Sequence, residues 1–293
     1  MQRYCIFLDN RAYQRYFMLI YIKKVLPLQE ISHIMRPLIL ISNDDGLNSR
    51  GLAALIEAMR PLGDLFVCVP DGPRSGASCS ITDTVPLKCW VVRSEPGLEM
   101  YACTGTPCMC TKLAIDNLVP RRPDLVVAGI NHGSNASVNI HYSGTTAVST
   151  EGALQGIPSV AFSLDDIDTE APLDHLVPVC RQIASYTLER GLPFGIYLNV
   201  NFPAGEELKG VRVCRMAYSR WVDEFEPCPR SRGGRWYWLC GEQVDEEPDS
   251  EDTDLWALRH HYAAVVPISI DPTARTLIKE LEIRNDALFL DCR

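Results

Sequence analysis

Two neighbouring aspartates follow the first long aliphatic run of this sequence. The segment LILISNDDG places Asp44 and Asp45 just after residues 38–41, which are all Leu or Ile. Adjacent carboxylates repel each other unless a cation or a proton lies between them, and Mg²⁺ prefers oxygen ligands. The alternative is helix capping, because Asn and Asp often accept hydrogen bonds from the first N–H groups of a helix. By itself, NDDG favours capping by roughly two to one, since short motifs often match by chance.

Three further polar segments reverse that preference. PDGPRSGAS follows the apolar run DLFVCV, AGINHGSN ends the run that begins at residue 124, and HYSGTT precedes a helix of small residues. Ligands of open α/β sheets bind at the carboxyl ends of the strands, so all of these segments are expected at one edge of the sheet. The hydroxyl of Ser75 and the amide oxygen of Asn131 would then complete an all-oxygen metal site with Asp44 and Asp45.

The segment YSGTT is a candidate phosphate site. The N–H groups and the dipole at the start of a helix attract anions, and Ser143, Gly144 and Thr145 stand at that position. The signal is weak alone, because Ser and Thr cap many helices. Arg74 is a stronger candidate, since an Arg in a Gly-rich loop can meet an anion. His132 is a weaker candidate for a contact with substrate, because a lone His beside a turn is more often structural or exposed.

Alternating strands and helices are expected to position these segments. Continuous apolar runs predict buried parallel strands, and apolar residues at helical spacing predict helices. The sequence therefore predicts an α/β fold with a mostly parallel sheet and helices on both faces. The expected strands are 36–42, 64–70, 124–131, 157–164 and 195–203, and the expected helices are 49–63, 108–119, 145–156 and 175–191.

The composition changes after about residue 210. Four of the five Trp residues lie beyond that point, and aromatic stretches on both sides of SRGG predict a β-hairpin. Exposed aromatic surface of this kind is typical of an interface or of a cover over a site. We expect three regions: an N-terminal extension outside the fold (1–34), a catalytic domain (35–210) and a hairpin and oligomerisation region (211–293).

Composition narrows the function classes and the compartment. The net charge of −9 disfavours binding to a nucleic-acid polymer. The 12 cysteines include no C-x-x-C pair, so we expect reduced thiols in the cytoplasm rather than a zinc site. The apolar run FMLIYI is far shorter than the roughly 20 residues that span a bilayer. No motif precedes Met35, which we expect to be the native start.

Ordered motifs over residues 36–270 resemble the SurE (survival protein E) family of nucleotidases. They are LISNDDG, PRSGAS, GTP, PDLVVAGINHGSN, YSGTTAVSTEGALQGIPSVAFS, NVNFP and TDLWALRHHYAAVVPIS. The resemblance implies a Rossmann-like domain and a C-terminal hairpin exchanged between subunits. It also implies one divalent cation per subunit, Mg²⁺ or Mn²⁺, with Asp44, Asp45, Ser75 and Asn131 as its ligands. One departure follows GTP, where the family's Ala-Asp-Cys is replaced by Cys108-Met109-Cys110.

The resulting hypothesis is a metal-dependent phosphomonoesterase that hydrolyses nucleoside monophosphates. The 5′ esters are expected substrates, 3′ esters are left open, and a homodimer or homotetramer is expected. The alternative is a non-catalytic nucleotide- or metal-binding protein on the same fold. The expected catalytic residues are Asp44, Asp45 and Asn131. The expected substrate-binding residues are Asn43, Arg74, Gly133, Ser143, Gly144 and Thr145.

Overall fold

The structure is a computed structural model that describes residues 36–228 and 233–283. The chain divides into two units after Pro37, and every described helix and strand lies in the second unit. The expected extension, residues 1–34, lies outside the described residues, and so does part of the SRGG turn.

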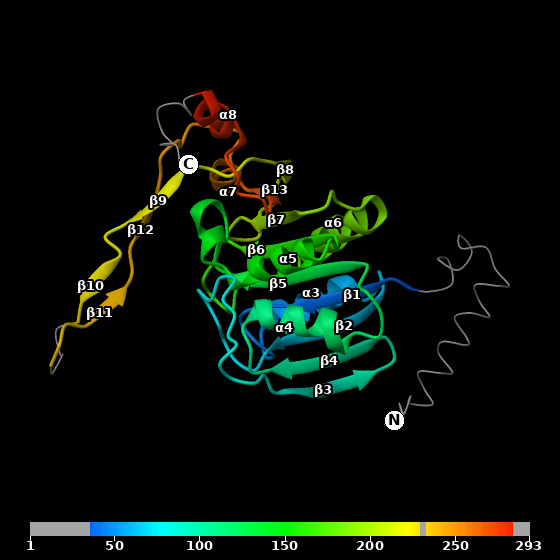
Figure 1. Cartoon of the computed structure of the whole chain (residues 1–293). Helices are drawn as coiled ribbons and strands as arrows, with labels where there is room; N and C mark the ends of the chain where they lie inside the picture. The colour runs from blue at the N-terminus through cyan, green and yellow to red at the C-terminus, as the bar shows by residue number, and fades with distance from the viewer. Residues whose placement is uncertain (1–35, 229–232, 284–293) are drawn as a thin grey trace, which may run out of the picture. The chain divides into compact units, whose positions relative to one another are not determined.

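A nine-stranded sheet organises the second unit (Figure 1). Its order is β3-β4-β2-β1-β5-β6-β7-β13-β8, and the strands from β4 to β7 run parallel to one another. The strands of this sheet are β1 (Leu38–Ser42), β2 (Asp64–Pro70), β3 (Cys89–Glu95), β4 (Leu98–Cys103), β5 (Leu125–His132), β6 (Ser159–Leu164), β7 (Ile196–Phe202), β8 (Gly210–Val213) and β13 (Tyr262–Ser269).

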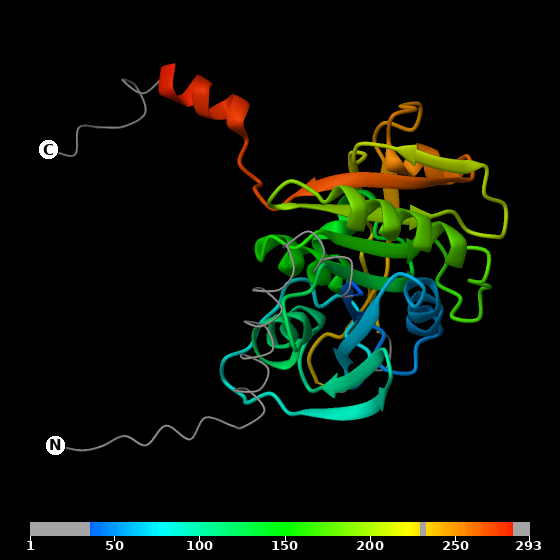
Figure 2. The same cartoon turned by 90° about the vertical axis from the view of Figure 1, so that its right-hand side faces the viewer.

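Helices cover both faces of the sheet (Figures 1 and 2). Ile39 and Ile41 belong to the cluster on one face, whereas Leu38 and Leu40 belong to the cluster on the other, as the alternation of a strand requires. The expected Rossmann-like α/β fold is confirmed. Helices α3 (Arg50–Met59) and α6 (Val177–Arg190) lie on the first face, and α4 (Pro107–Leu113), η1 (Ala114–Leu118) and α5 (Gly144–Leu154) lie on the second.

The order of the strands fixes where a ligand can bind. Strand β1 lies between β2 and β5, so the chain leaves β1 towards one side of the sheet and later returns on the other side. The crevice at the carboxyl ends of two such strands is the usual ligand site of open parallel sheets. The NDDG and GINHG segments end β1 and β5, so both stand at this crevice.

The C-terminal region contributes to the main sheet. Strand β13 lies between β7 and β8, and α7 (Asp254–Arg259) precedes it. The expected division at residue 210 therefore does not separate two folding units. A separate oligomerisation role for residues 211–293 stays a prediction about function. Helix α8 (Arg275–Ile283) is the last described element.

The predicted β-hairpin is present in the described residues. It contains two ladders, β9 (Ser219–Val222) with β12 (Glu242–Asp245) and β10 (Phe225–Pro227) with β11 (Tyr237–Leu239), as Figure 1 shows. The indole of Trp221 donates to Oδ1 of Asn139 at 2.8 Å, which joins the first ladder to η2 (Ser137–His141). The second ladder is exposed: Phe225, Trp238 and Leu239 each keep 66–73% of their surface.

The described part of the chain can be examined for membrane-spanning helices and for disulfides. No helix there combines the length and the apolar character that crossing a bilayer requires. The ten cysteines of that part are all free thiols, and six of them are buried.

Candidate active site

The turn after β1 is held by Asn43. Its side-chain amide donates to the carbonyl of Gly46 at 3.0 Å, and its oxygen accepts from the N–H of Gly46 at 3.2 Å. Gly46 has a φ of +86°, which a residue with a side chain rarely adopts. Asn43 is thus engaged in the turn that presents the two carboxylates, and its contact with substrate stays a prediction.

Asp44 lies against the start of helix α5. It is 4% exposed, and the hydroxyl of Thr145 donates a hydrogen bond to its Oδ1 atom. Burial raises the pKa of Asp44 to about 6, and the charge of Asp45 adds to the rise, whereas hydrogen bonds from the hydroxyl and the N–H of Thr145 lower it. A carboxylate with a raised pKa beside a second carboxylate favours any ligand that supplies positive charge.

Asp45 faces both the other carboxylate and open space. Its Oδ2 atom is buried and has no hydrogen-bond partner among the described residues. Burial raises the pKa of Asp45, while hydrogen bonds from the N–H of His132 and the hydroxyl of Ser49 lower it. An unpartnered buried carboxylate oxygen is costly, which indicates that this atom has another partner in the working protein.

The loop after β2 reaches the same place. The N–H of Arg74 donates to the carbonyl of Asp44 at 2.7 Å. Its guanidinium pairs with Asp71 at 3.0 Å, and both side chains are partly exposed. Ser75 is next in the chain and exposed. The described residues include no hydrogen bond from Ser75 to either carboxylate, so its role as a ligand stays a prediction.

The end of β5, where Asn131 lies, departs from regular strand pairing. The register with β6 shifts between Ala128 and Asn131, and such bulges re-aim side chains near sites. Gly129 permits this shape, because it has a φ of +107° and an added Cβ would stand 2.2 Å from the carbonyl oxygen of Phe162. The amide of Asn131 donates to the carbonyl of Gly133 at 2.7 Å, and its role as a metal ligand stays a prediction.

Helix α5 begins where the sequence predicts a phosphate site. Ser143 is its N-cap and accepts from the N–H of Thr146 at 3.0 Å. At Gly144 a Cβ would stand 2.8 Å from Cβ of Asp44, so the helix can approach the carboxylate only without a side chain there. The anion that the described residues place at this helix start is the carboxylate of Asp44 itself. Phosphate binding by residues 143–145, and substrate binding by Gly133, stay predictions.

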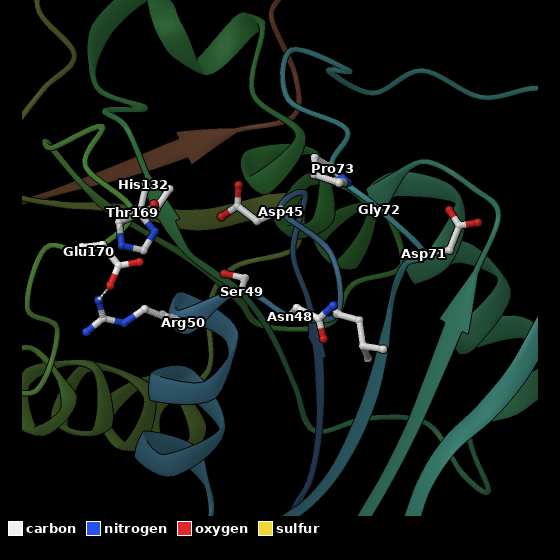
Figure 3. Close-up of a pocket in the computed structure, with 11 residues that line it drawn as sticks. Asp45, Asn48, Ser49, Arg50, Asp71, Gly72, Pro73, His132, Thr169 and Glu170 are labelled. Carbon is white, nitrogen blue, oxygen red and sulfur yellow. Dashed lines mark hydrogen bonds and ion pairs between the residues drawn. The ribbon is translucent and has the colours of Figure 1, made fainter.

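A cleft of about 440 Å³ opens beside Asp45 (Figure 3). A volume of this size is typical of small-molecule sites. Figure 3 shows His132, Thr169 and the ion-paired Glu170 and Arg50 on one side of Asp45. The lining residues are Asp45, Leu47, Asn48, Ser49, Arg50, Asp71, Gly72, Pro73, His132, Thr169 and Glu170.

Sequence reasoning missed several of these lining residues. His132 was a weaker candidate, yet it lines the cleft and its Nε2 atom is buried without a described partner. Burial lowers the pKa of His132, and the charge of Arg50 lowers it further. Ser49 could have been found, because a Ser just before a helical pattern is a typical N-cap. Thr169 and Glu170 carry no sequence signal.

The side chains at the crevice fit a hard divalent cation. No three His, Cys, Asp or Glu side chains within residues 36–228 and 233–283 are arranged to hold a metal ion. A cation here would therefore have the two carboxylates and neutral oxygens as ligands, which suits Mg²⁺ or Mn²⁺. The unpartnered Oδ2 of Asp45 and the raised pKa of Asp44 are the observations that favour such a ligand.

Comparison with known proteins identifies the family. Residues 39–223 match the family model of survival protein SurE. The chain belongs to the SurE family. The resemblance noted in the sequence is thereby confirmed.

Relatives in this family match almost over their whole length. "5′-nucleotidase SurE" of Phocaeicola vulgatus is 51% identical over 250 residues, which are 85% of this chain and 97% of that protein. The protein of the same name from Bacteroides fragilis is 47% identical, over 84% of this chain and 97% of its own. The crystal structure of the SurE protein from Aquifex aeolicus superposes with a TM-score of 0.73 at 34% identity, covering 85% of this chain and all of that one.

Proposed function

We propose that this chain is a metal-dependent phosphomonoesterase that hydrolyses nucleoside monophosphates to a nucleoside and phosphate. The observation that carries the proposal is the pair of adjacent carboxylates, Asp44 and Asp45, with one buried oxygen unpartnered at the mouth of a nucleoside-sized cleft. The SurE relatives named 5′-nucleotidase support the same activity.

Different groups hold the two carboxylates in place. Thr145 fixes the orientation of Asp44, and the N–H of His132 and the hydroxyl of Ser49 fix that of Asp45. With Ser75 and Asn131, they would hold one divalent cation per subunit, Mg²⁺ or Mn²⁺. When bound, the cation supplies positive charge that stabilises negative charge on a phosphoryl oxygen.

The remaining residues would place the ester. Arg74 is anchored through its backbone to Asp44, and its guanidinium, which now pairs with Asp71, would turn to the phosphate and offset its negative charge. The nucleoside would lie in the cleft between His132 and residues 71–73, because this cleft adjoins Asp45. The start of α5, residues 143–145, lies behind Asp44 and keeps that carboxylate ionised.

Finer properties of the enzyme are predictions of the same proposal. We expect hydrolysis of 5′ esters and retain 3′ esters as additional substrates. The enzyme is expected in the cytoplasm, as a homodimer or homotetramer that associates through the exposed β10–β11 ladder.

A substrate panel tests the proposal. With Mn²⁺ present, phosphate release is measured from 5′-AMP, 5′-GMP, 5′-UMP and 3′-AMP, with bis(p-nitrophenyl) phosphate as a diester control. We expect release from the monoesters and none from the diester. Binding of 5′-AMP without release of phosphate would favour the alternative, a non-catalytic nucleotide-binding protein.

A further inference from the structure

Four cysteines converge away from the candidate active site, on the α4 face of the sheet. Cys68 is in β2, Cys89 in β3, Cys103 in β4 and Cys110 in α4, and all four lie in or against one apolar cluster. Cys89 and Cys110 both interact with Cys68 and with Cys103. No metal-binding arrangement of three or more such groups occurs among the described residues, so the chemistry open to these thiols is oxidation.

The strand register brings two of these thiols face to face. Cys89 and Cys103 are direct partners in the antiparallel pairing of β3 with β4. The neighbouring pair is hydrogen-bonded, since Thr104 donates its N–H to the carbonyl of Lys88 at 2.9 Å. The carbonyl of Cys103 instead accepts from Asp71 at 2.8 Å, on the β2 side. Cys89 and Cys103 therefore form a pair without mutual backbone hydrogen bonds.

Such a pair has the spacing that a disulfide needs. Directly opposed residues without mutual hydrogen bonds have Cα atoms about 4.5 Å apart, and their side chains project from the same face. Disulfides join Cα atoms that are about 4.4–6.8 Å apart. The two sulfurs can therefore bond without a large shift of either strand.

We propose that Cys89 and Cys103 form a reversible intrachain disulfide by exchange with a low-molecular-weight disulfide such as oxidised glutathione. Cys89 is partly exposed and Cys103 is fully buried, so Cys89 is the thiol that an outside reagent reaches first.

The exchange takes two steps. The Cys89 thiolate attacks one sulfur of the reagent, forming a mixed disulfide and releasing one reagent thiolate. The Cys103 thiolate then attacks the Cys89 sulfur, forming the Cys89–Cys103 bond and releasing the second. The two thiolates take up the two protons that the cysteines lose, so the chain is oxidised by two electrons and the reagent reduced by two.

The surroundings of the two sulfurs favour the second step over the first. A hydrogen bond from Cys110 lowers the pKa of Cys103, which favours the thiolate that the second step requires. Burial raises the pKa of Cys89 to about 12, so we expect its first attack to be slow and faster at alkaline pH.

A tryptic digest shows whether Cys89 is linked to the peptide that contains Cys103. Cleavage after Lys88 and Arg93 places Cys89 in peptide 89–93, and the next cleavage, after Lys112, places Cys103 in peptide 94–112. The full-length chain is incubated with oxidised glutathione at pH 8.5, its free thiols are blocked, and it is digested without reductant. Mass spectrometry should show the two peptides linked, two mass units below their sum, and separated again by dithiothreitol.

Matched variants assign the second sulfur within peptide 94–112, which also contains Cys108 and Cys110. C103S should remove the link, whereas C108S and C110S should retain it. The oxidised wild type should also melt several degrees above its reduced form, because the bond closes a loop in the unfolded chain. If C103S fails to fold, retention of the link in both C108S and C110S assigns the second sulfur to Cys103 by elimination. A link that survives in C103S, or glutathione attached to Cys89 without the link, would overturn the proposal.

Discussion

Thr145 donates a hydrogen bond from its hydroxyl to the buried carboxylate of Asp44, which lies 101 residues earlier in the chain. The contact joins the start of α5 to the turn after β1. It places a hydroxyl, an N–H group and the helix dipole against a carboxylate that burial would otherwise drive towards its protonated form. Thr145 is therefore a positioning residue for Asp44.

Replacing Thr145 tests this role. Thr145→Val keeps the shape of the side chain and removes the donor, so the pKa of Asp44 should rise further. Hydrogen bonds to charged groups contribute about 1.5–3 kcal/mol, so we expect activity to fall about 10- to 100-fold. Thr145→Ser retains the hydroxyl and should stay within about threefold of the parent. Equal activities of the Val and Ser variants would show that the hydroxyl has no such role.

The approach of α5 to Asp44 is tested at a glycine. A Cβ at Gly144 would stand 2.8 Å from Cβ of Asp44 and 3.1 Å from Cγ of Pro107. Gly144→Ala should therefore push the helix from the carboxylate and reduce kcat at least about tenfold, a change of 1.4 kcal/mol. Leu154→Ala is the control, because Leu154 lies at the far end of the same helix and is 50% exposed. Similar kinetics for both variants would show that close approach at Gly144 is unimportant.

Charge at Asp44 should destabilise the metal-free protein. Burial raises the pKa of Asp44 from its ordinary value of 3.8 to about 6 in the folded chain. This rise corresponds to a loss of about 3 kcal/mol in the free energy of unfolding when Asp44 is ionised. Because the pKa of Asp44 is higher in the folded chain than in the unfolded chain, its contribution to the free energy of unfolding is fully present below about pH 4. That contribution is lost as the pH rises through about 6.

Denaturant unfolding of the protein, with metal removed by a chelator, measures this loss of stability. Asp44→Asn removes the titration, so at pH 7.5 the variant should be about 1–3 kcal/mol more stable than the parent. The difference should shrink as the pH falls and disappear well below 3.8, where Asp44 is protonated in both the folded and the unfolded state. If Asp44→Asn were less stable than the parent at pH 7.5, the ionised carboxylate of Asp44 would not be what destabilises the metal-free protein.

His132 is expected to bind the nucleoside part of the substrate. Its imidazole lines the cleft and carries a buried Nε2 without a described partner. His132→Ala should raise KM for 5′-AMP about 3- to 10-fold, the value of one hydrogen bond, and leave kcat nearly unchanged. The small ester p-nitrophenyl phosphate is the control substrate, since it lacks a nucleoside. An equal loss with both substrates would place His132 outside nucleoside binding.

The exposed hairpin is predicted to hold subunits together. Trp236, Tyr237 and Trp238 keep 50–68% of their surface, which is costly for aromatic side chains in water. Replacing residues 224–240 with a short Gly-Ser bridge removes the β10–β11 ladder and leaves Trp221 on η2. Light scattering should then report a monomer. A deletion protein with the parent's oligomeric mass would show that the ladder is not the interface.

Local patterns predicted much of the fold. The continuous apolar runs at β1, β2, β5, β6 and β7 identify strands buried on both faces, and the segments that end three of them do gather at one crevice. The β3–β4 hairpin was not expected, because β3 is an exposed edge strand whose apolar run, CWVV, is followed at once by the polar residues RSE. The return of β13 into the main sheet depends on pairing with β7, which lies about 60 residues earlier and leaves no local signal.

Local sequence patterns also indicated only part of the candidate site. Residue types and strand ends selected Asp44, Asp45 and Asn131 as candidates, and their roles stay predictions. The contact of Asp44 with Thr145, by contrast, joins distant parts of the chain, so no local pattern indicated it, and phosphate binding at this helix start stays a prediction. The opposition of Cys89 and Cys103 likewise follows from strand register, which residue spacing alone does not determine.

Phosphate release from 5′-AMP by chelated enzyme, titrated with Mg²⁺ or Mn²⁺, tests the metal-dependent nucleotidase most directly. Activity should be absent after chelation and should return with saturation at one cation per subunit. Asp44→Asn and Asp45→Asn should stay folded, bind no Mn²⁺ by calorimetry and release no phosphate at any metal concentration. Full activity in the chelated enzyme, or Mn²⁺ binding by Asp44→Asn equal to that of the parent, would contradict the account.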